Sequence, residues 1–328
     1  MKKDKPYLIV GQGIAGTILA HHLLAANIPF QIWDSPQHFK SSFAAGGIFN
    51  PVTGRKLEKT WLAEELFSYL FTFYQGLEKK LSATFFYPMP LFRPFANEEM
   101  KSWLTDRREQ IEHHFLRWSD EGVWVNQAGW VDVATLLIRS KEYFIDKGLY
   151  FARAFDSSLT HDFEAIIHCD GFHASQNSPW SVLPFLPAKG ELIRFSSNEP
   201  SKDFILNKNG FVLPLVHGEF KVGATYRWDE FSQDVTDSSR DELIGKLASM
   251  GVSEYTLLET YVGVRPATQD RRPFIGILPN NRGIFNGFGS KGVSLTPYFA
   301  AAFVQEIRGE KEVPAEVSIR RYAHLFSV

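Results

Sequence analysis

Three glycines near the start of the chain have the spacing of a turn that binds a pyrophosphate. Gly11, Gly13 and Gly16 form a GxGxxG motif. The first glycine permits a sharp turn, the second lets the backbone approach a pyrophosphate, and the third lets a helix pack on a strand. Asp34 lies 18 residues beyond Gly16, where a carboxylate can accept hydrogen bonds from a ribose diol. These residues predict a bound dinucleotide, without distinguishing FAD from NAD.

The segments around these glycines have the pattern of a strand, a helix and a second strand. Residues 7–10 form a short apolar run, residues 14–26 have helical periodicity, and a second strand ends at Asp34. This agreement favours a bound dinucleotide over the alternative, a glycine-rich turn in an empty doubly wound sheet. The residues predicted to contact the dinucleotide here are Gly11, Gln12, Gly13, Ile14, Ala15, Gly16, Asp34 and Ser35.

A second glycine loop lies near the other end of the sequence. Gly287, Gly289 and Gly292 also satisfy GxGxxG, between a short strand at 284–286 and a helix at about 293–307. The residues after this helix contain no buried strand that ends in an acid, which excludes a second complete nucleotide-binding unit. The helix N-terminus instead offers N–H groups that favour negative charge. The alternative is a glycine turn that only caps the last helix.

The overall composition is that of an ordinary globular protein. The chain has 328 residues, enough for two domains, with 35 Lys and Arg against 37 Asp and Glu. This charge balance argues against a primary nucleic-acid binder but leaves a local basic patch open. No apolar run is long enough for a membrane span, and glycines interrupt the apolar start, which argues against a signal peptide.

Cysteine and histidine give little sign of metal chemistry. Cys169 is the only cysteine, which excludes an intrachain disulfide and a cysteine-rich metal site. A reducing compartment fits best, so we expect a cytoplasmic protein. The pairs His21-His22 and His113-His114 point to different helix faces and belong to no HExxH motif, so we expect ordinary surface or core histidines and no metal.

Several further motifs together resemble one known family. The segments "AAGGIFNP", "GWVDVATLL", "FEAIIHCDGFHAS" and "GVRPATQDRRPFIG" are similar to the D-amino acid oxidase superfamily of FAD-dependent oxidoreductases. That group includes glycine and sarcosine oxidases and the FAD domain of a bifunctional tRNA-modifying enzyme. The resemblance covers nearly the whole chain in order, with the middle weakest, and its last motif is far more specific than the N-terminal glycines.

The resemblance implies an α/β protein of two discontinuous domains. One is an FAD-binding Rossmann-like domain of the glutathione-reductase type, and the other is an α+β substrate domain with an antiparallel sheet. The segments "KGELIRFSS" and "FVLPLVHGEFKVGATY" independently have the pattern of antiparallel strands. The expected division is 1–75, 120–178 and 262–328 for the FAD domain, and 76–119 and 179–261 for the substrate domain.

The resemblance also implies which further residues lie beside the cofactor. We expect noncovalent FAD, because Cys169 is far in sequence from the C-terminal cysteine that tethers flavin in sarcosine oxidases. Donors in the second glycine loop would stabilise the reduced ring, which is anionic around N1 and the C2 carbonyl. Asp170 departs from the family, which usually has alanine before the glycine. The additional expected FAD contacts are Ser42, Phe43, Ala44, Ala45, Gly46, Gly47, Asp170, Gly171, Arg265, Gly287, Gly289, Ser290, Lys291, Gly292, Val293 and Ser294.

Four residues are the candidates for chemistry at the substrate. The family moves a hydride from the carbon beside nitrogen to flavin N5, and Arg265 matches the arginine that binds the substrate carboxylate. Lys221 matches a lysine that assists reaction with oxygen over the flavin. Tyr226 is a further pocket candidate, and Arg55 is a possible second carboxylate anchor facing Arg265. The alternatives are a structural ion pair for Arg265 and an exposed strand lysine for Lys221.

The substrate and the electron acceptor stay open at this stage. Phe211 stands where glycine-oxidase-like members have a pocket tyrosine, which puts a small amino acid substrate in doubt. The leading interpretation is an amine or amino acid oxidase that uses oxygen or another diffusible acceptor. A second interpretation is oxidation of a carboxymethylamino-modified tRNA base, against which the missing methyltransferase half and the balanced charge count. A third is a flavin-binding protein without turnover.

Overall fold

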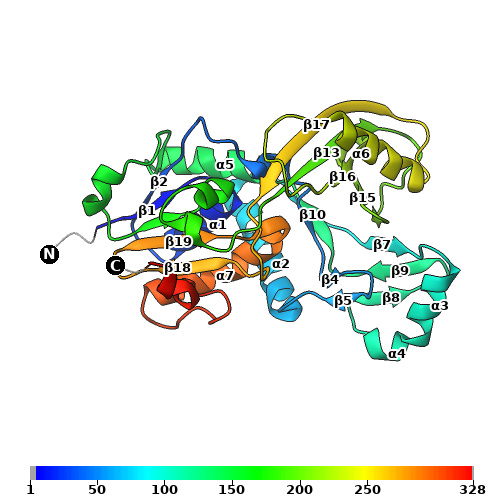
Figure 1. Cartoon of the computed structure of the whole chain (residues 1–328), viewed down its shortest axis with the longest axis horizontal. Coiled ribbons are helices and arrows are strands. Elements are labelled where there is room, and N and C mark those ends of the chain that lie inside the picture. Colours follow the sequence, from blue (N-terminus) through cyan, green and yellow to red (C-terminus); the bar gives the residue numbers. More distant parts are fainter. Residues whose placement is uncertain (1–4, 327–328) are drawn as a thin grey trace.

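The computed structural model describes residues 5–326, without the side chains of residues 159 and 160, and shows two lobes (Figure 1). The first lobe contains a six-stranded sheet, and the second contains most of an eight-stranded sheet. This is the mixed α/β architecture that the sequence predicted. No helix within residues 5–326 is long and apolar enough to cross a membrane.

The six-stranded sheet has the order β11-β2-β1-β12-β19-β18. The first five strands are parallel, and β18 runs antiparallel to β19. Apart from the edge strand β11, most residues of these strands are buried, which explains their short and largely apolar sequences. Their bounds are Tyr7–Val10 for β1, Phe30–Trp33 for β2, Tyr150–Phe151 for β11, Ile166–His168 for β12, Phe274–Ile277 for β18 and Arg282–Asn286 for β19.

Four helices pack around this sheet (Figure 1). Their bounds are Ile14–Ala25 for α1, Ala63–Leu81 for α2, Val133–Asp146 for α5 and Gly292–Ile307 for α7. Helix α1 can approach β1 closely because Gly16 has no side chain. A Cβ atom there would lie 2.0 Å from the carbonyl oxygen of Gly11. The third glycine of the motif is therefore required by helix packing.

The eight-stranded sheet has the order β17-β13-β16-β15-β14-β7-β9-β8. Its neighbours are antiparallel, as the sequence predicted, except that β14 pairs with β7 in parallel. Helix α6, Asp237–Ser249, packs on one face, and α3, Glu98–Asp106, and α4, Arg108–Ile111, lie near β8 and β9 (Figure 1). The strand bounds are Leu91–Pro94 for β7, Leu116–Trp118 for β8, Gly122–Val125 for β9, Ala188–Ser196 for β13, Ile205–Asn207 for β14, Phe211–Pro214 for β15, Glu219–Gly223 for β16 and Thr256–Arg265 for β17.

Short elements connect the two lobes. Strands β3, Ile48–Phe49, β10, Gly129–Val131, and β6, Phe86–Pro88, form a three-stranded sheet, and β4, Val52–Thr53, pairs with β5, Glu58–Lys59. The 3-10 turns are Ser41–Ala44 for η1, Ser157–Asp162 for η2, Gly171–Gln176 for η3, Trp180–Val182 for η4, Val216–Gly218 for η5, Gly289–Lys291 for η6 and Ile319–Phe326 for η7.

The sheets do not follow the expected domain division at every boundary. Strand β9 falls within 120–178, which the sequence assigned to the FAD domain, yet it pairs with β7 and β8 of the eight-stranded sheet. Strand β17 likewise extends in that sheet as far as Arg265, three residues past the expected boundary at 262. A boundary that separates the sheets would fall after β9 and after β17.

We predict that Gly16→Ala lowers the free energy of unfolding by about 1–3 kcal/mol, because the added methyl group overpacks the contact between α1 and the turn after β1. Gly76 is the matched control, because it also lies in a helix and its Cβ would meet no atom within 4 Å. Gly76→Ala should raise stability by up to about 1 kcal/mol. Denaturant titrations measure both changes, and equal effects of the two substitutions would contradict this account.

Candidate active site

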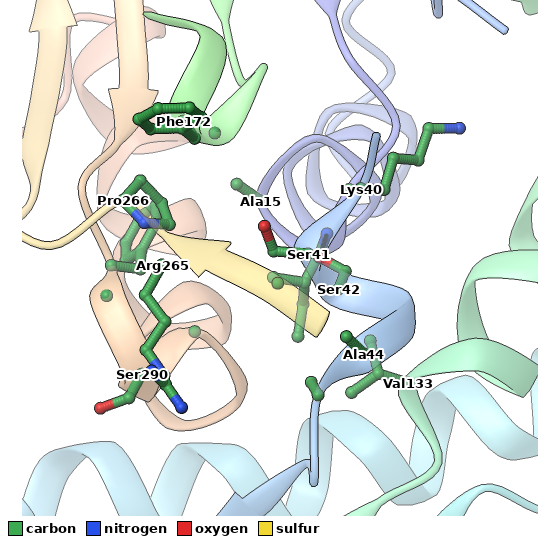
Figure 2. Close-up of a pocket in the computed structure, with 18 of the residues that line it drawn as sticks. Ala15, Lys40, Ser41, Ser42, Ala44, Val133, Phe172, Arg265, Pro266 and Ser290 are labelled. Atoms are coloured by element: carbon green, nitrogen blue, oxygen red, sulfur yellow. Dashed lines mark hydrogen bonds between the residues drawn. The ribbon is translucent and has the colours of Figure 1, made fainter. Parts of the chain in front are cut away.

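A cavity of about 250 Å³ lies where the two sheets meet. The first sheet contributes the β1–α1 turn, the end of β12 and the turn before α7, and the second contributes β13, the end of β17 and the segment after β16. Figure 2 shows Arg265 and Pro266 on one side and Ala15, Ser41 and Ser42 on the other. The site thus combines parts of the chain that are far apart in sequence.

The β1–α1 turn presents open backbone to this cavity. Gly11 has φ +96°, and a Cβ there would lie 2.9 Å from Asp170 Cα. Gly13 begins helix α1 without a capping side chain of its own, and the Ser42 hydroxyl instead accepts the Ile14 N–H at 3.1 Å. Free N–H groups at a helix N-terminus and the absence of side chains are what a pyrophosphate needs.

Asp34 is a buried carboxylate with capacity for one more hydrogen bond. Its Oδ1 accepts the Gln12 N–H at 3.0 Å, and its Oδ2 accepts from Lys40 Nζ at 2.5 Å and from the Tyr150 hydroxyl at 2.8 Å. A carboxylate offers about four acceptor positions, so one is left for a ligand such as a ribose hydroxyl. Burial, and then the hydrogen bond to Asp34, raise the pKa of Tyr150, which keeps it protonated as a donor.

The small residues of the η1 loop, which we define as η1 together with residues 45–47, are explained partly by packing within the protein. Gly47 has φ +69°, and a Cβ there would lie 2.0 Å from the carbonyl oxygen of Val131. A Cβ on Gly46 would lie 3.0 Å from the Phe211 ring. Ala44, Ala45, Gly46 and Gly47 all line the cavity, as expected. Ser41, which the sequence analysis missed, links the loop to β17, because its hydroxyl donates to the Val264 carbonyl at 2.6 Å and accepts the Val264 N–H at 3.0 Å.

Arg265 is a half-buried cation that faces the cavity without an anionic partner. Its guanidinium lies over Gly190 of β13, where a Cβ would approach both Nη atoms to 2.2 Å. Its Cζ lies 4.2 Å from the centre of the Tyr226 ring, and Nη1 donates weakly to the Thr225 carbonyl at 3.4 Å. Within residues 5–326 no ion pair to Arg265 is found, and burial lowers its pKa. The alternative of a structural ion pair is therefore wrong for the described residues.

Lys221 contacts the η1 loop but does not line the cavity itself. It is half-buried on β16, on the strand face opposite Phe220 and Val222, which are in the core. Its Nζ donates to the Ala45 carbonyl at 3.5 Å and lies 4.7 Å from the centre of the Tyr261 ring. Burial lowers the pKa of Lys221. The interpretation as an exposed strand lysine is wrong, and contact with the cofactor stays a prediction.

The structure does not bring Arg55 together with Arg265. Arg55 is exposed in the turn between β4 and β5, because the pairing of Val52 with Lys59 folds this segment into a hairpin. It does not line the cavity and is not an anchor in this arrangement. The other predicted contacts that do not line the cavity are Gly16, Ser35, Phe43, Gly287, Lys291 and Ser294. Of these, Lys291 donates to Thr60 Oγ1 at 3.3 Å, and burial, with nearby Arg271 and Arg272, lowers its pKa to about 8.

The remaining predicted residues do line the cavity. They are Gly11, Gln12, Gly13, Ile14, Ala15, Asp34, Ser42, Ala44, Ala45, Gly46, Gly47, Asp170, Gly171, Tyr226, Arg265, Gly289, Ser290, Gly292 and Val293. Asp170 Oδ1 is buried without a hydrogen-bond partner, so it can accept from a ligand. Cys169 also lines the cavity, and burial raises the pKa of its thiol well above the usual value, which disfavours a covalent thiolate link.

Sequence reasoning missed several residues of the cavity wall. The rings of His38 and His173 stack at 4.1 Å, and Phe172 lies next to His173. Phe172 and His173 lie in the segment "FEAIIHCDGFHAS" but were not predicted as contacts, and His38 lies in no motif that was recognised. Gly190 could have been found, because a glycine inside a strand often marks the close approach of another group. Within residues 5–326 no cluster suited to a metal ion occurs, and His21 instead bonds Ser140 at 2.9 Å.

Comparison with known proteins defines the class of this chain. A family model described as "FAD dependent oxidoreductase" (DAO) matches residues 7–306. The chain therefore belongs to this family, and FAD is the cofactor that the family uses. The cavity fits it, because the glycine turn, the free acceptor position of Asp34 and the small η1 loop suit a pyrophosphate, a ribose and a flat ring.

Individual relatives are distant. The bifunctional tRNA 5-methylaminomethyl-2-thiouridine biosynthesis protein MnmC of Marinobacter nauticus is 23% identical over 92% of this chain and 55% of its own length. The uncharacterized oxidoreductase YurR of Bacillus subtilis is 29% identical over 31% of this chain and 29% of its length. The chain thus spans about half or less of these curated relatives.

Solved structures of similar fold match almost end to end. Glycine oxidase from Geobacillus kaustophilus has a TM-score of 0.77 at 18% identity, covering 96% of this chain and 98% of its own. Iminodiacetate oxidase from Chelativorans sp. BNC1 has a TM-score of 0.75 at 21% identity, covering 95% and 98%. At these identities the likeness establishes the fold alone.

We predict that Asp34→Asn weakens FAD binding roughly 10- to 100-fold, because a charge-assisted hydrogen bond contributes about 1.5–3 kcal/mol. Fluorescence titration of the apoprotein with FAD measures the dissociation constant. Asp146→Asn, an exposed change at the end of α5, is the control and should leave that constant unchanged. Equal constants for Asp34→Asn and the native protein would remove Asp34 from the cofactor site.

Proposed function

We propose that this protein oxidises the C–N bond of a small amine or amino acid that carries a carboxylate. The observation that carries the proposal is Arg265, a half-buried guanidinium that faces the cavity with no carboxylate partner within residues 5–326. A cation taken out of water without an anion is costly, and an anionic ligand relieves that cost. A planar guanidinium also fixes the orientation of a bound carboxylate.

The residues around Arg265 favour a fixed position for this cation. Tyr226 supports the guanidinium from one side, and Gly190 leaves room for it against β13. Pro266 restricts the backbone of Arg265 to extended geometry. FAD, when bound, accepts the hydride from the carbon beside nitrogen. The contribution of the protein is then to hold the carboxylate so that this carbon faces the ring.

Phe211, another residue of the cavity wall, argues for a substrate larger than glycine. Phe211 lies against Gly46 and Gly223, each of which would place a Cβ 3.0 Å from its ring. This ring presents an apolar surface where glycine-oxidase-like members of the family have a tyrosine hydroxyl. An apolar group on the substrate can contact Phe211 without leaving a polar group unpaired. We include oxygen or another diffusible compound as the electron acceptor.

A second candidate is oxidation of a carboxymethylamino group on a tRNA base. The match to MnmC over 92% of the chain favours it. The net charge of −2 offers little attraction for an RNA backbone. Anaerobic bleaching of the flavin by carboxymethylaminomethyl-modified tRNA, but not by free amino acids, would reverse this order.

The first test is an anaerobic panel of D-amino acids, N-substituted glycines and proline analogues, in which at least one member should bleach the flavin. Failure of the whole panel and of modified tRNA would leave flavin binding without turnover, which is the third interpretation of the sequence.

For a substrate found in this way, we predict that Arg265→Ala raises KM about 30- to 1000-fold, because about 2–4 kcal/mol of charge-assisted binding is lost. Bound FAD should stay unchanged. Arg117→Ala is the matched control, because Arg117 also lies over an aromatic ring, that of Trp124 at 5.0 Å, and does not line the cavity. Steady-state kinetics and the flavin content of each variant decide the matter, and a KM unaffected by Arg265→Ala would refute the proposed anchor.

A further inference from the structure

Two exposed aromatic side chains lie next to the Arg265 end of the cavity. Tyr226 lines the cavity and is 44% exposed, and Trp228 is 59% exposed. Trp228 has the highest exposed fraction among the large hydrophobic side chains of the part of the chain that the structure describes. Large apolar side chains held in water next to a cavity often mark a binding site.

The backbone turns these two rings to the same side. Arg227 lies between them and pairs in both directions with the backbone of Lys189 on β13. In such an extended segment, alternate side chains point to opposite faces. The Arg227 side chain lies on the face opposite the two rings, where it forms an ion pair with Glu242 of α6 at 2.9 Å. Tyr226 and Trp228 therefore share a face, with ring centres 6.1 Å apart.

Buried polar contacts fix the segment that follows. The Lys189 side chain is fully buried, and its Nζ donates to Glu230 Oε1 at 2.7 Å, to Ser232 Oγ at 3.2 Å and to the Asp234 carbonyl at 2.7 Å. Removing any of these contacts would leave the buried ammonium short of partners. The contacts therefore favour a single conformation of residues 230–234. The backbone on both sides of Trp228 is consequently held, by the pairing of Arg227 with Lys189 and by these contacts of the Lys189 side chain.

We propose that Tyr226 and Trp228 form a stacking subsite for a planar ring on the substrate whose carboxylate Arg265 binds. The substrate class is then an amino acid or N-substituted glycine that bears an arylmethyl group. Arg265 Cζ lies 4.2 Å from the Tyr226 ring, and Trp228 is the next ring outward, so one such molecule reaches both the cation and the rings. This inference rests on the proposed function and names its substrate class.

The aromatic residues of the proposed subsite adjoin the cavity, and this position favours a small-molecule ligand. Phe172, which lines the cavity, lies 5.3 Å from Phe231, the next aromatic residue along the loop. Aromatic side chains thus border the cavity from both η3 and the loop after β16. A ring that leaves the cavity beside Arg265 passes directly onto Tyr226. A small ligand suits this arrangement better than RNA, because Asp229 and Glu230 adjoin Trp228 and repel phosphate.

The test measures binding by the holoprotein, with the flavin spectrum as the reporter. Indole-3-acetate and acetate are titrated into the native protein, Trp228→Ala, Trp228→Phe and Phe151→Ala. Phe151 is the matched control, because it is an exposed aromatic residue on β11 that does not line the cavity. Trp228→Ala should weaken indole-3-acetate about 3- to 10-fold, and acetate should be unaffected. Trp228→Phe should retain most of the native affinity, and Phe151→Ala all of it.

The outcomes separate this inference from the proposed function. Unchanged affinity for indole-3-acetate in Trp228→Ala, or equal weakening of both ligands, overturns the stacking subsite. Arg265→Ala should weaken both ligands, and if it weakens neither, the carboxylate anchor and the proposed function fail. In turnover, Trp228→Ala should raise KM for N-benzylglycine but not for sarcosine, without changing kcat. Turnover confined to a modified base in tRNA would overturn the small-molecule occupant.

Discussion

The half-burial of the Arg265 guanidinium, without an anionic partner within residues 5–326, is the constraint on which the proposed substrate site depends. Arg265 is the last residue of β17, where the eight-stranded sheet ends and the chain returns toward β18 of the other sheet. Burying a cation without an anion opposes folding unless aromatic and carbonyl groups partly compensate, as Tyr226 and Thr225 do here. The remaining imbalance is the basis of our proposal that this part of the cavity binds a negatively charged group.

The cofactor end of the cavity follows a different physical rule. There the cavity is lined by glycines, whose backbone is accessible because they have no side chains. Gly11 packs against the backbone of Asp170, and Gly16 packs against the carbonyl of Gly11, at distances that leave no room for a Cβ atom. Helix α1 can therefore begin with its N–H groups toward the cavity. A single carboxylate, Asp34, is already held by Gln12, Lys40 and Tyr150. This end thus offers the backbone N–H groups and the carboxylate that a phosphate and a sugar need, whereas the other end offers a cation beside an aromatic ring.

The sequence predicted those parts of the fold and the site whose residues lie close together along the chain. Gly11, Gly13 and Asp34 belong to one strand-helix-strand unit, and local spacing alone placed them together. Arg265 was found because a specific motif surrounds it. Arg55 was misplaced because a hairpin between β4 and β5 turns it outward, and a shift of a few residues decides which side chain faces a cavity. His38 and Phe172 reach the cavity, and Tyr150 reaches Asp34, only through the packing of segments that are distant in sequence.

The central claim is that Arg265 binds a carboxylate, and the most direct measurement varies both partners. Acetate and acetamide are titrated into the native holoprotein and into Arg265→Ala, and the four dissociation constants give the coupling between the guanidinium and the ligand charge. The account predicts that the native protein prefers acetate and that this preference disappears in Arg265→Ala. A preference for acetate that survives the substitution would show that another group binds the anion, and would contradict the account.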